Sequence, residues 1–444
     1  MVLEKNLYGM PNAARGWSKH RDAFIMKAFN EGAWSCVPSI MDPCLFIIDK
    51  LIDTPMEPKV ASPRGTSSSP TPKASDPEIP SKRGKDGDAE QLGEGDELPD
   101  NIIRSWVLIH TDDCDAYGQS LDVLHEINDM MNAEWKTEIV SSDFVLGVKR
   151  TVHKGPDGWS CTLTMTSFIN DLVKAFQGPL DEKFNNRVPS IPFPEGVILS
   201  KSDLPQEGEV QRNIDRGYQR LVGSLLWAVR HVYPLCSYGC SQLCKLMATP
   251  TDHAWDCALH MLNYLKHHAN EGIKFTESDD DMLAFVDASN KDDPTDGKTQ
   301  YGYVILWGGP LTVKSGKLNH VGINSTYNEY MALHHCIKQV VWFRQLMMEL
   351  GLSNYCKVPT RIYADNKQAN NICSEDLVTA GNMYFRTGYH YNKEAVNDGL
   401  VTIHYCETSV NVSDAQTKGL GPIKIEAFEP YLTGHKPLVI PYHN

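Results

Sequence analysis

The stretch that decides the fold of this chain runs from Leu283 to Glu329; it opens as LAFVDASN (residues 283–290) and closes within NSTYNEYMALHH (residues 324–335). The opening segment has the pattern of a buried strand and ends in a carboxylate, Asp287. A glycine-rich hairpin pattern follows, and an amphipathic helix then carries a second carboxylate, Glu329, in its first turn. The pattern therefore predicts two acids at the ends of consecutive elements.

Two more acids occur in similar settings further along the chain. Asp365 ends the strand-like segment RIYAD, and Asp414 lies in NVSDAQTKGL. Four carboxylates within reach of one another repel strongly unless cations lie between them. Oxygen-only ligands suit Mg²⁺ or Mn²⁺ rather than zinc, and a pair of such ions roughly 4 Å apart activates water for phosphodiester cleavage. Acids in these positions also serve as caps and turn residues, so their spacing alone leaves both interpretations open.

From residue 281 onward the chain alternates strand-like and helix-like segments, which predicts an α/β domain with a mixed sheet. The expected elements are a strand at 281–289, a hairpin over 299–319, a long helix at 326–351, a strand at 361–365, a short helix at 366–373, a strand at 401–406 and a helix that contains Asp414.

The first part of the chain is organised differently. Strand-like segments at 42–48 and 105–118 lie on either side of residues 53–100, a tract without aromatic residues or cysteines and dense in Pro, Ser, Gly and charged residues. Such a composition cannot bury enough apolar surface to offset its ordering entropy, so we expect disorder there. We expect the flanking strands to form a hairpin whose loop carries this insertion. Residues 214–270 have the pattern of successive helices.

The composition narrows the class of protein. A length of 444 residues allows two or three domains, and a net charge of −14 argues against holding nucleic acid by bulk electrostatics. No apolar run approaches the roughly 18–20 residues that span a bilayer, and the N-terminus has no signal-peptide pattern, so we expect an intracellular protein without a membrane partner. The twelve cysteines include no C-x-x-C pair. Cys236, Cys240 and Cys244 recur every four residues, as small core residues on one helix face do, rather than zinc ligands.

Nine short motifs follow one another along the chain: LYGMPNAARGW, DPCLFI, IHTDD, YQRLVGSLLWAVRHVYP, HAWDCALHMLNYLKHH, YGYVILWGG, NSTYNEYMAL, ADNKQA and SDAQTKGL. Each is weak by itself, but in this order they resemble the reverse transcriptase and ribonuclease H portion of a copia-type LTR-retrotransposon Pol polyprotein. The resemblance covers nearly the whole chain outside 53–100. It implies α+β and α/β domains: a partial reverse-transcriptase palm (1–52 and 101–180), helical thumb and connection segments (181–278), a ribonuclease H-like mixed-sheet domain (279–430) and a tail (431–444).

By motif position, the resemblance places Asp287, Glu329, Asp365 and Asp414 on the ribonuclease H carboxylates, as catalytic residues and metal ligands. Tyr327 stands where the family often has a second glutamate. Such enzymes cut the RNA strand of an RNA–DNA hybrid with two Mg²⁺ ions. The resemblance therefore implies Mg²⁺ (or Mn²⁺) as cofactor, an RNA–DNA hybrid and a nucleic-acid template and primer as partners, and a location in a cytoplasmic particle or the nucleus. The oligomeric state is left open.

The polymerase half departs from the family pattern. Asp112 and Asp113 stand at the family's polymerase Asp-Asp pair as a residual site, but the earlier block that supplies a third carboxylate has no counterpart. His110 and Pro11 replace the usual Tyr and Lys. The sequence thus predicts an active ribonuclease H beside an inactive polymerase. The alternative is a non-catalytic retroelement relic or nucleic-acid-binding module, and convergence of the four carboxylates separates the two.

Overall fold

The computed structural model describes residues 13–53, 98–111, 113–140, 143–156, 158–185, 187–278, 280–289, 293–374 and 386–437. The chain divides into two compact units, Met1–Glu138 and Ile139–Asn444. Most of the tract at 53–100 lies outside the described residues, so its disorder stays a prediction. None of the helices that the structure describes is both long and apolar enough to cross a membrane.

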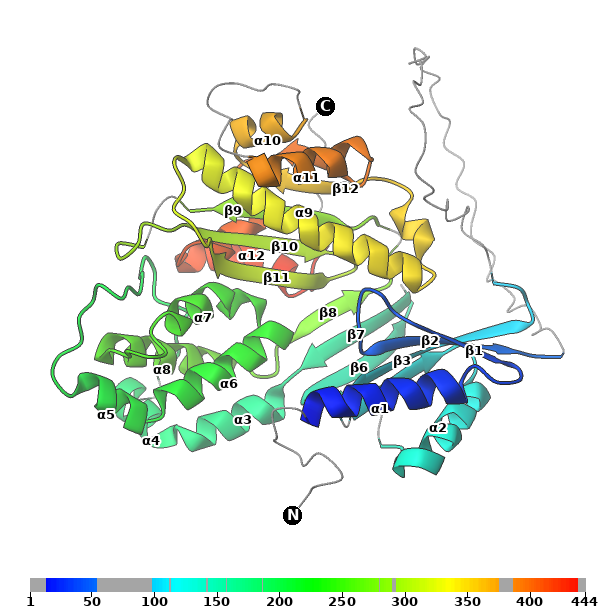
Figure 1. Ribbon diagram of the computed structural model, residues 1–444. Coiled ribbons are helices and arrows are strands. Elements are labelled where there is room, and N and C mark those ends of the chain that lie inside the picture. The colour runs from blue at the N-terminus through cyan, green and yellow to red at the C-terminus, as the bar shows by residue number, and fades with distance from the viewer. Residues whose placement is uncertain are drawn as a thin grey trace, which may run out of the picture. The chain divides into compact units, whose positions relative to one another are not determined.

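The first unit is built on a four-stranded antiparallel sheet in the order β1-β2-β3-β4 (Figure 1). Its elements are α1 (Ala13–Ala28), β1 (Trp34–Pro38), β2 (Leu45–Leu51), β3 (Ile102–His110), β4 (Asp113–Gly118) and α2 (Leu121–Trp135). The strands on either side of the predicted insertion, β2 and β3, pair along the whole length of β2, which confirms the hairpin. Ile25 of α1, Val107 of β3 and Ile127 of α2 meet in one buried core.

The second unit begins with an antiparallel sheet and a group of helices. The strands, in the order β5-β6-β7-β8, are Phe144–Val145, Val148–Gly155, Gly158–Thr164 and Ile273–Thr276. The helices are α3 (Thr166–Ala175), α4 (Gln177–Phe184), α5 (Glu209–Asp215), α6 (Tyr218–His231), the 3₁₀ turn η1 (Pro234–Cys236), α7 (Ser237–Cys244) and α8 (Asp252–His267). The predicted helical segment at 214–270 is therefore confirmed.

The helices of this group share one apolar core, to which α6 contributes Tyr218, Leu221 and Leu225, all fully buried. Cys236 and Cys240 lie in the same core at 0% and 1% exposure, and Cys244 packs against it. All twelve cysteines are free thiols. The expectation that this cysteine stripe fills a core is confirmed.

The C-terminal part of the second unit contains a five-stranded sheet in the order β11-β10-β9-β12-β13. The elements are β9 (Leu283–Ala288), β10 (Gln300–Leu306), β11 (Pro310–Lys317), α9 (Ser325–Glu349), the 3₁₀ turn η2 (Ser353–Cys356), β12 (Thr360–Ala364), α10 (Lys367–Ser374), α11 (Arg386–Asn397), β13 (Val401–Tyr405), the 3₁₀ turn η4 (Val412–Gln416) and α12 (Pro422–Leu432). β9, β10 and β11 pair antiparallel, whereas β12 runs parallel to both β9 and β13. The predicted mixed sheet is confirmed.

Both faces of this sheet are covered, because alternate residues of each strand point to opposite sides. Ala284 and Val286 of β9 pack in the core that α9 covers with residues such as Tyr330 and Leu333. Phe285 points the other way, into a core completed by η4 and α12. Figure 1 shows α9 lying across the sheet with α12 behind it. A strand buried on both faces reads as the continuous apolar run LAFV, which explains the opening sequence pattern.

Candidate functional site

Two of the predicted acids meet at one edge of the sheet because β9 and β12 are parallel neighbours. Their register pairs Phe285 with Tyr363. Asp287 and Asp365 each lie two residues further along, so the same register brings them side by side. Asp287 is the penultimate residue of β9 and is 2% exposed, while Asp365 directly follows β12 and is half-buried. The carboxylates are therefore held by a sheet rather than by loops.

The third acid, Glu329, comes from α9 and not from the sheet. The Asn324 side chain caps this helix by accepting a hydrogen bond from the Tyr327 backbone N–H at 2.8 Å. Glu329 is the fifth residue of α9, so the expectation that it lies in the first turn is wrong by one position. It is 7% exposed. One carboxylate oxygen each from Asp287, Glu329 and Asp365 lie within 4.8 Å of one another.

The electrostatics of this trio favour a cation. Burial raises the pKa of Glu329 to about 9, and the neighbouring carboxylates of Asp287 and Asp365 add to the shift. Burial likewise raises the pKa of Asp287 to about 6, although the Lys418 ammonium partly opposes it. The Oε2 atom of Glu329 is buried and accepts no hydrogen bond. A buried carboxylate oxygen without a donor, beside two further acids, is the donor set that a divalent cation fits.

Asp414, the fourth predicted acid, is buried at 1% exposure but is not part of this trio. It lies in η4, a 3₁₀ turn rather than the expected helix. Its carboxylate forms ion pairs with two ammonium groups, Lys418 and Lys424, the second at 2.9 Å. The Lys418 Nζ also lies 3.7 Å from Asp287. Asp414 therefore adjoins the trio through a lysine that contacts both sides.

Three further groups hold η4 against the end of β9. The Asn411 side chain donates to the Val286 carbonyl oxygen at 3.0 Å and caps η4 by accepting from Ser413. The Thr417 hydroxyl donates to Asp287. Gly302, opposite Asp287 in the sheet, leaves room for η4, since a Cβ there would lie 2.4 Å from the Cβ of Gln416.

Sequence reasoning assigned no role to Asn411, Thr417, Lys418 or Lys424. The first three lie within the quoted segment NVSDAQTKGL. Thr417 and Lys418 gave a signal in their spacing, because they place a hydroxyl and an ammonium three and four residues after an acid. Lys424 gave no signal, because it reaches Asp414 from α12.

Comparison with known proteins shows which sequences this chain resembles. A Pol polyprotein from transposon TNT 1-94 of Nicotiana tabacum is 26% identical over 250 residues, which cover 55% of this chain and 19% of that protein. The Pol polyproteins from transposons RE2 and RE1 of Arabidopsis thaliana are 26% and 24% identical, over 54% and 73% of this chain. This chain is similar to retrovirus-related transposon Pol polyproteins. The expected copia-type resemblance is confirmed, and the chain matches about a fifth of the length of these relatives or less.

Solved structures align over parts of this Pol-like chain. A ribonuclease H1 isolated from compost covers 31% of the chain with 12% identity and a TM-score of 0.25. A foamy viral protease-reverse transcriptase in complex with dsDNA covers 68% of the chain with 15% identity and a TM-score of 0.35. No family model matches the sequence.

Thr111 lies in the turn between β3, which ends at His110, and β4, which begins with the second residue of the Asp-Asp pair at the polymerase position of this Pol-like chain. Asp112 lies outside the described residues, and Asp113 is exposed at the start of β4. Arg21, 4% exposed, fixes the base of this turn by donating to the carbonyl oxygens of Ile109 and Pro43 at 3.1 and 2.8 Å. Among the described residues, no group of three metal-ligating side chains includes Asp113.

Proposed function

We propose that this Pol-like chain hydrolyses the RNA strand of an RNA–DNA hybrid in a reaction that requires two divalent cations, Mg²⁺ or Mn²⁺. The observation that carries the proposal is the convergence of Asp287, Glu329 and Asp365 at one sheet edge. The similarity to transposon Pol polyproteins supports a nucleic acid as the substrate. Oxygen ligands from three buried or half-buried carboxylates suit these cations better than zinc.

Asp287, Glu329 and Asp365 would hold the cations, which when bound supply an activated water and charge stabilisation at the leaving oxygen. The protein's own contribution is to hold these acids in fixed orientations and to leave Oε2 of Glu329 without a hydrogen-bond donor among the residues that the structure describes. The Thr408 hydroxyl orients Asp365 by donating to its Oδ2 at 2.6 Å. Thr417 does the same for Asp287. In this proposal Asp414 acts as a fourth ligand once Lys418 turns toward solvent, where its side chain is already 45% exposed.

The remaining segments follow the Pol pattern in this proposal. Residues 1–52 and 101–180 are a partial reverse-transcriptase palm, 181–278 are thumb and connection helices, and 279–430 form the ribonuclease H domain. The polymerase site is inactive, in keeping with the exposed Asp113 that joins no metal-ligating group of described side chains. Template, primer and hybrid are the expected partners, and a cytoplasmic particle or the nucleus the expected location.

The test is cleavage of a hybrid whose RNA strand is end-labelled, with purified full-length protein. We expect nicking that needs Mg²⁺ or Mn²⁺ and stops with EDTA. Asp365→Asn removes a ligand at the sheet edge and should abolish nicking, whereas Asp398→Asn changes an exposed acid near α11 and should not. Undiminished cleavage by Asp365→Asn would refute the assignment of the site.

A non-catalytic nucleic-acid-binding module is the competing function, and one observation favours it. Asp414 is neutralised by Lys418 and Lys424 instead of facing the other three acids. This alternative predicts that the wild-type chain retains the hybrid in a gel-shift assay and leaves its RNA strand intact at every Mg²⁺ and Mn²⁺ concentration. Cleavage that is lost in Asp365→Asn excludes it.

A further inference from the structure

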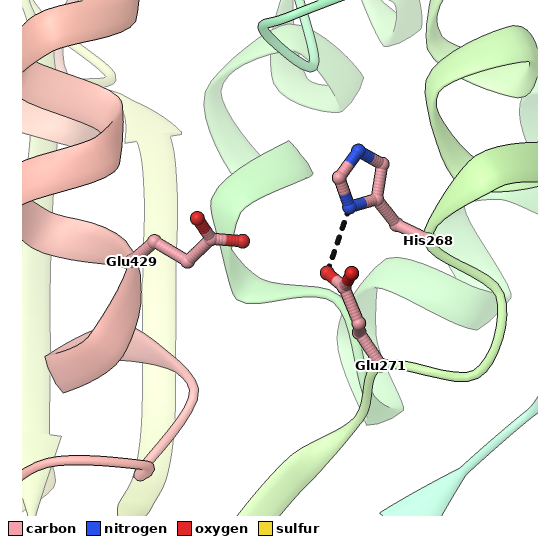
Figure 2. A group of neighbouring side chains, drawn as sticks. All are labelled: His268, Glu271 and Glu429. Atoms are coloured by element: carbon pink, nitrogen blue, oxygen red, sulfur yellow. Dashed lines mark hydrogen bonds and ion pairs between the residues drawn. The ribbon is translucent and has the colours of Figure 1, made fainter.

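A second group of potential metal ligands shares no residue with the carboxylate trio and lies where α8, β8 and α12 come together. His268 is the C-cap residue of α8, Glu271 precedes β8 and Glu429 lies in the last turn of α12. One ligand atom from each lies within 4.8 Å of the other two. Figure 2 shows the three side chains pointing from different elements toward a common centre.

The imidazole of His268 is held in place before any ligand arrives. Its ring stacks on the Tyr264 ring with a centroid distance of 4.0 Å and an interplanar angle of 18°. Its Nδ1 lies 2.7 Å from Oε2 of Glu271, within one hydrogen bond (Figure 2). The stacking fixes the plane of the ring, so the ring loses little further freedom when it binds a metal.

Glu429 supplies the carboxylate of this group that has no partner of its own among the described residues. Its half-buried carboxylate accepts no hydrogen bond and joins no ion pair within the described part of the chain. Burial raises the pKa of this carboxylate, and the negative charge of Glu271 raises it further, whereas His268 and His435 lower it. Glu271 and Glu429 repel each other beside His268, and a cation bound between the two carboxylates would relieve this repulsion.

A small cavity lies at this point. Its volume is about 20 Å³, and its walls include His268, Glu271 and Glu429 beside apolar residues such as Val232 and Leu235. A cavity needs about 10–15 Å³ on the same measure to hold one water. The cavity has room for one ion, and a water ligand would reach that ion from the solvent side, where Glu271 is exposed.

We propose that His268, Glu271 and Glu429 bind one Zn²⁺ ion, with water as the fourth ligand. An imidazole nitrogen combined with carboxylates suits zinc better than Mg²⁺, which prefers oxygen ligands alone. Neighbouring ligands around a tetrahedral zinc lie roughly 3.3 Å apart, given bonds of about 2.0–2.1 Å. The contact between His268 and Glu271 therefore opens slightly, the neutral imidazole binds through Nδ1 with its proton on Nε2, and the flexible Glu429 side chain closes the remaining gap.

Such a site would be structural and independent of the proposed ribonuclease activity. It would tie α12, which covers one face of the five-stranded sheet, to the end of α8 in the helical group. Zinc binding would then raise the stability of the second unit, because the ion binds the folded chain and finds no preformed site in the unfolded one.

The test is zinc stoichiometry of the metal-stripped full-length protein, measured by dialysis and elemental analysis in excess Mg²⁺ so that the carboxylate trio is occupied. We expect one zinc per chain and a rise in melting temperature on adding zinc. His268→Ala and Glu429→Gln should each lose the bound zinc and the rise. His267→Ala and Glu426→Gln, which change exposed neighbours on the same two helices, should keep both.

Two further measurements keep the outcomes distinct. Asp365→Asn should still bind one zinc, since loss of zinc in that variant would place the ion at the carboxylate trio and overturn the proposal. Cobalt added in place of zinc should give the visible absorption of a tetrahedral site in the wild type, and none in Glu429→Gln. A wild-type chain that binds no zinc, or a folded His268→Ala that binds as much as the wild type, overturns the proposal.

Discussion

The raised pKa of Glu329 leads to a prediction about stability without metal: in EDTA, Glu329→Gln should stabilise the chain at pH 7.5 but not at pH 5.0. The native carboxyl has a pKa of about 9 against an ordinary value of 4.5. The native state therefore holds a proton that the unfolded state releases between these values. For a carboxyl whose pKa is raised on folding, stability is greatest below the unfolded pKa and falls as pH rises toward the folded one.

The size of the effect follows from the two pKa values. At pH 7.5 the unfolded carboxyl is three pH units above its pKa of 4.5, which costs the native state about 4 kcal/mol at about 1.4 kcal/mol per unit. At pH 5.0 the same group costs about 1 kcal/mol. A glutamine carries neither cost, but burying its amide costs about 1–3 kcal/mol at both pH values. The gain from Glu329→Gln should therefore be about 3 kcal/mol larger at pH 7.5 than at pH 5.0.

The measurement is urea unfolding of the full-length chain in EDTA at the two pH values, followed by far-UV circular dichroism. Glu394→Gln, at an exposed position of α11, is the matched control and should change the free energy of unfolding equally at both. An effect of Glu329→Gln that is the same at pH 5.0 and pH 7.5 would show that the buried carboxyl is not protonated, and would refute the reasoning.

Three other substitutions test the surroundings of the trio. Mg²⁺ should raise the melting temperature of the wild type, and Asp365→Asn should remove most of that rise. Lys418→Met should destabilise the metal-free chain by roughly 1–3 kcal/mol in urea unfolding, less than for a fully buried pair because Lys418 is 45% exposed and Lys424 still pairs with Asp414. Gly302→Ala should lower the free energy of unfolding by about 1–3 kcal/mol, since the added Cβ overlaps η4.

The sheet and two of its acids could be predicted from the sequence because regular elements carry a period. A strand buried on both faces gives the apolar run before Asp287, and the segment before Asp365 has the same form. Once both strands are assigned to a mixed sheet, parallel pairing puts their ends together. The position of Glu329 needed only the start of a helix, and the error of one residue reflects how loosely sequence fixes a helix boundary.

The setting of Asp414 could not be predicted, because η4 is too short to show any period. A five-residue 3₁₀ turn owes its position to contacts distant in sequence, such as the hydrogen bond from Asn411 to Val286. The helix α12 was missed as well. Pro430 lies in its last turn, and the exposed Ile423 obscures the helical spacing of the buried Ile425, Phe428 and Leu432. The ion pair between Lys424 of this helix and Asp414 could not be predicted for the same reason.

The structure bears on whether the three acids are merely caps. The cap of α9 is Asn324, and Glu329 lies beyond the first turn, where a carboxylate caps nothing. The helix after Asp365 is capped by Asn366, whose side chain accepts from the Ala369 backbone N–H at 3.0 Å. Asp287 lies within a strand. None of the three acids therefore serves as a helix cap, and burial makes Glu329 and Asp287 costly to ionise without a nearby positive charge. A cation at the sheet edge is the account that leaves none of the three unexplained.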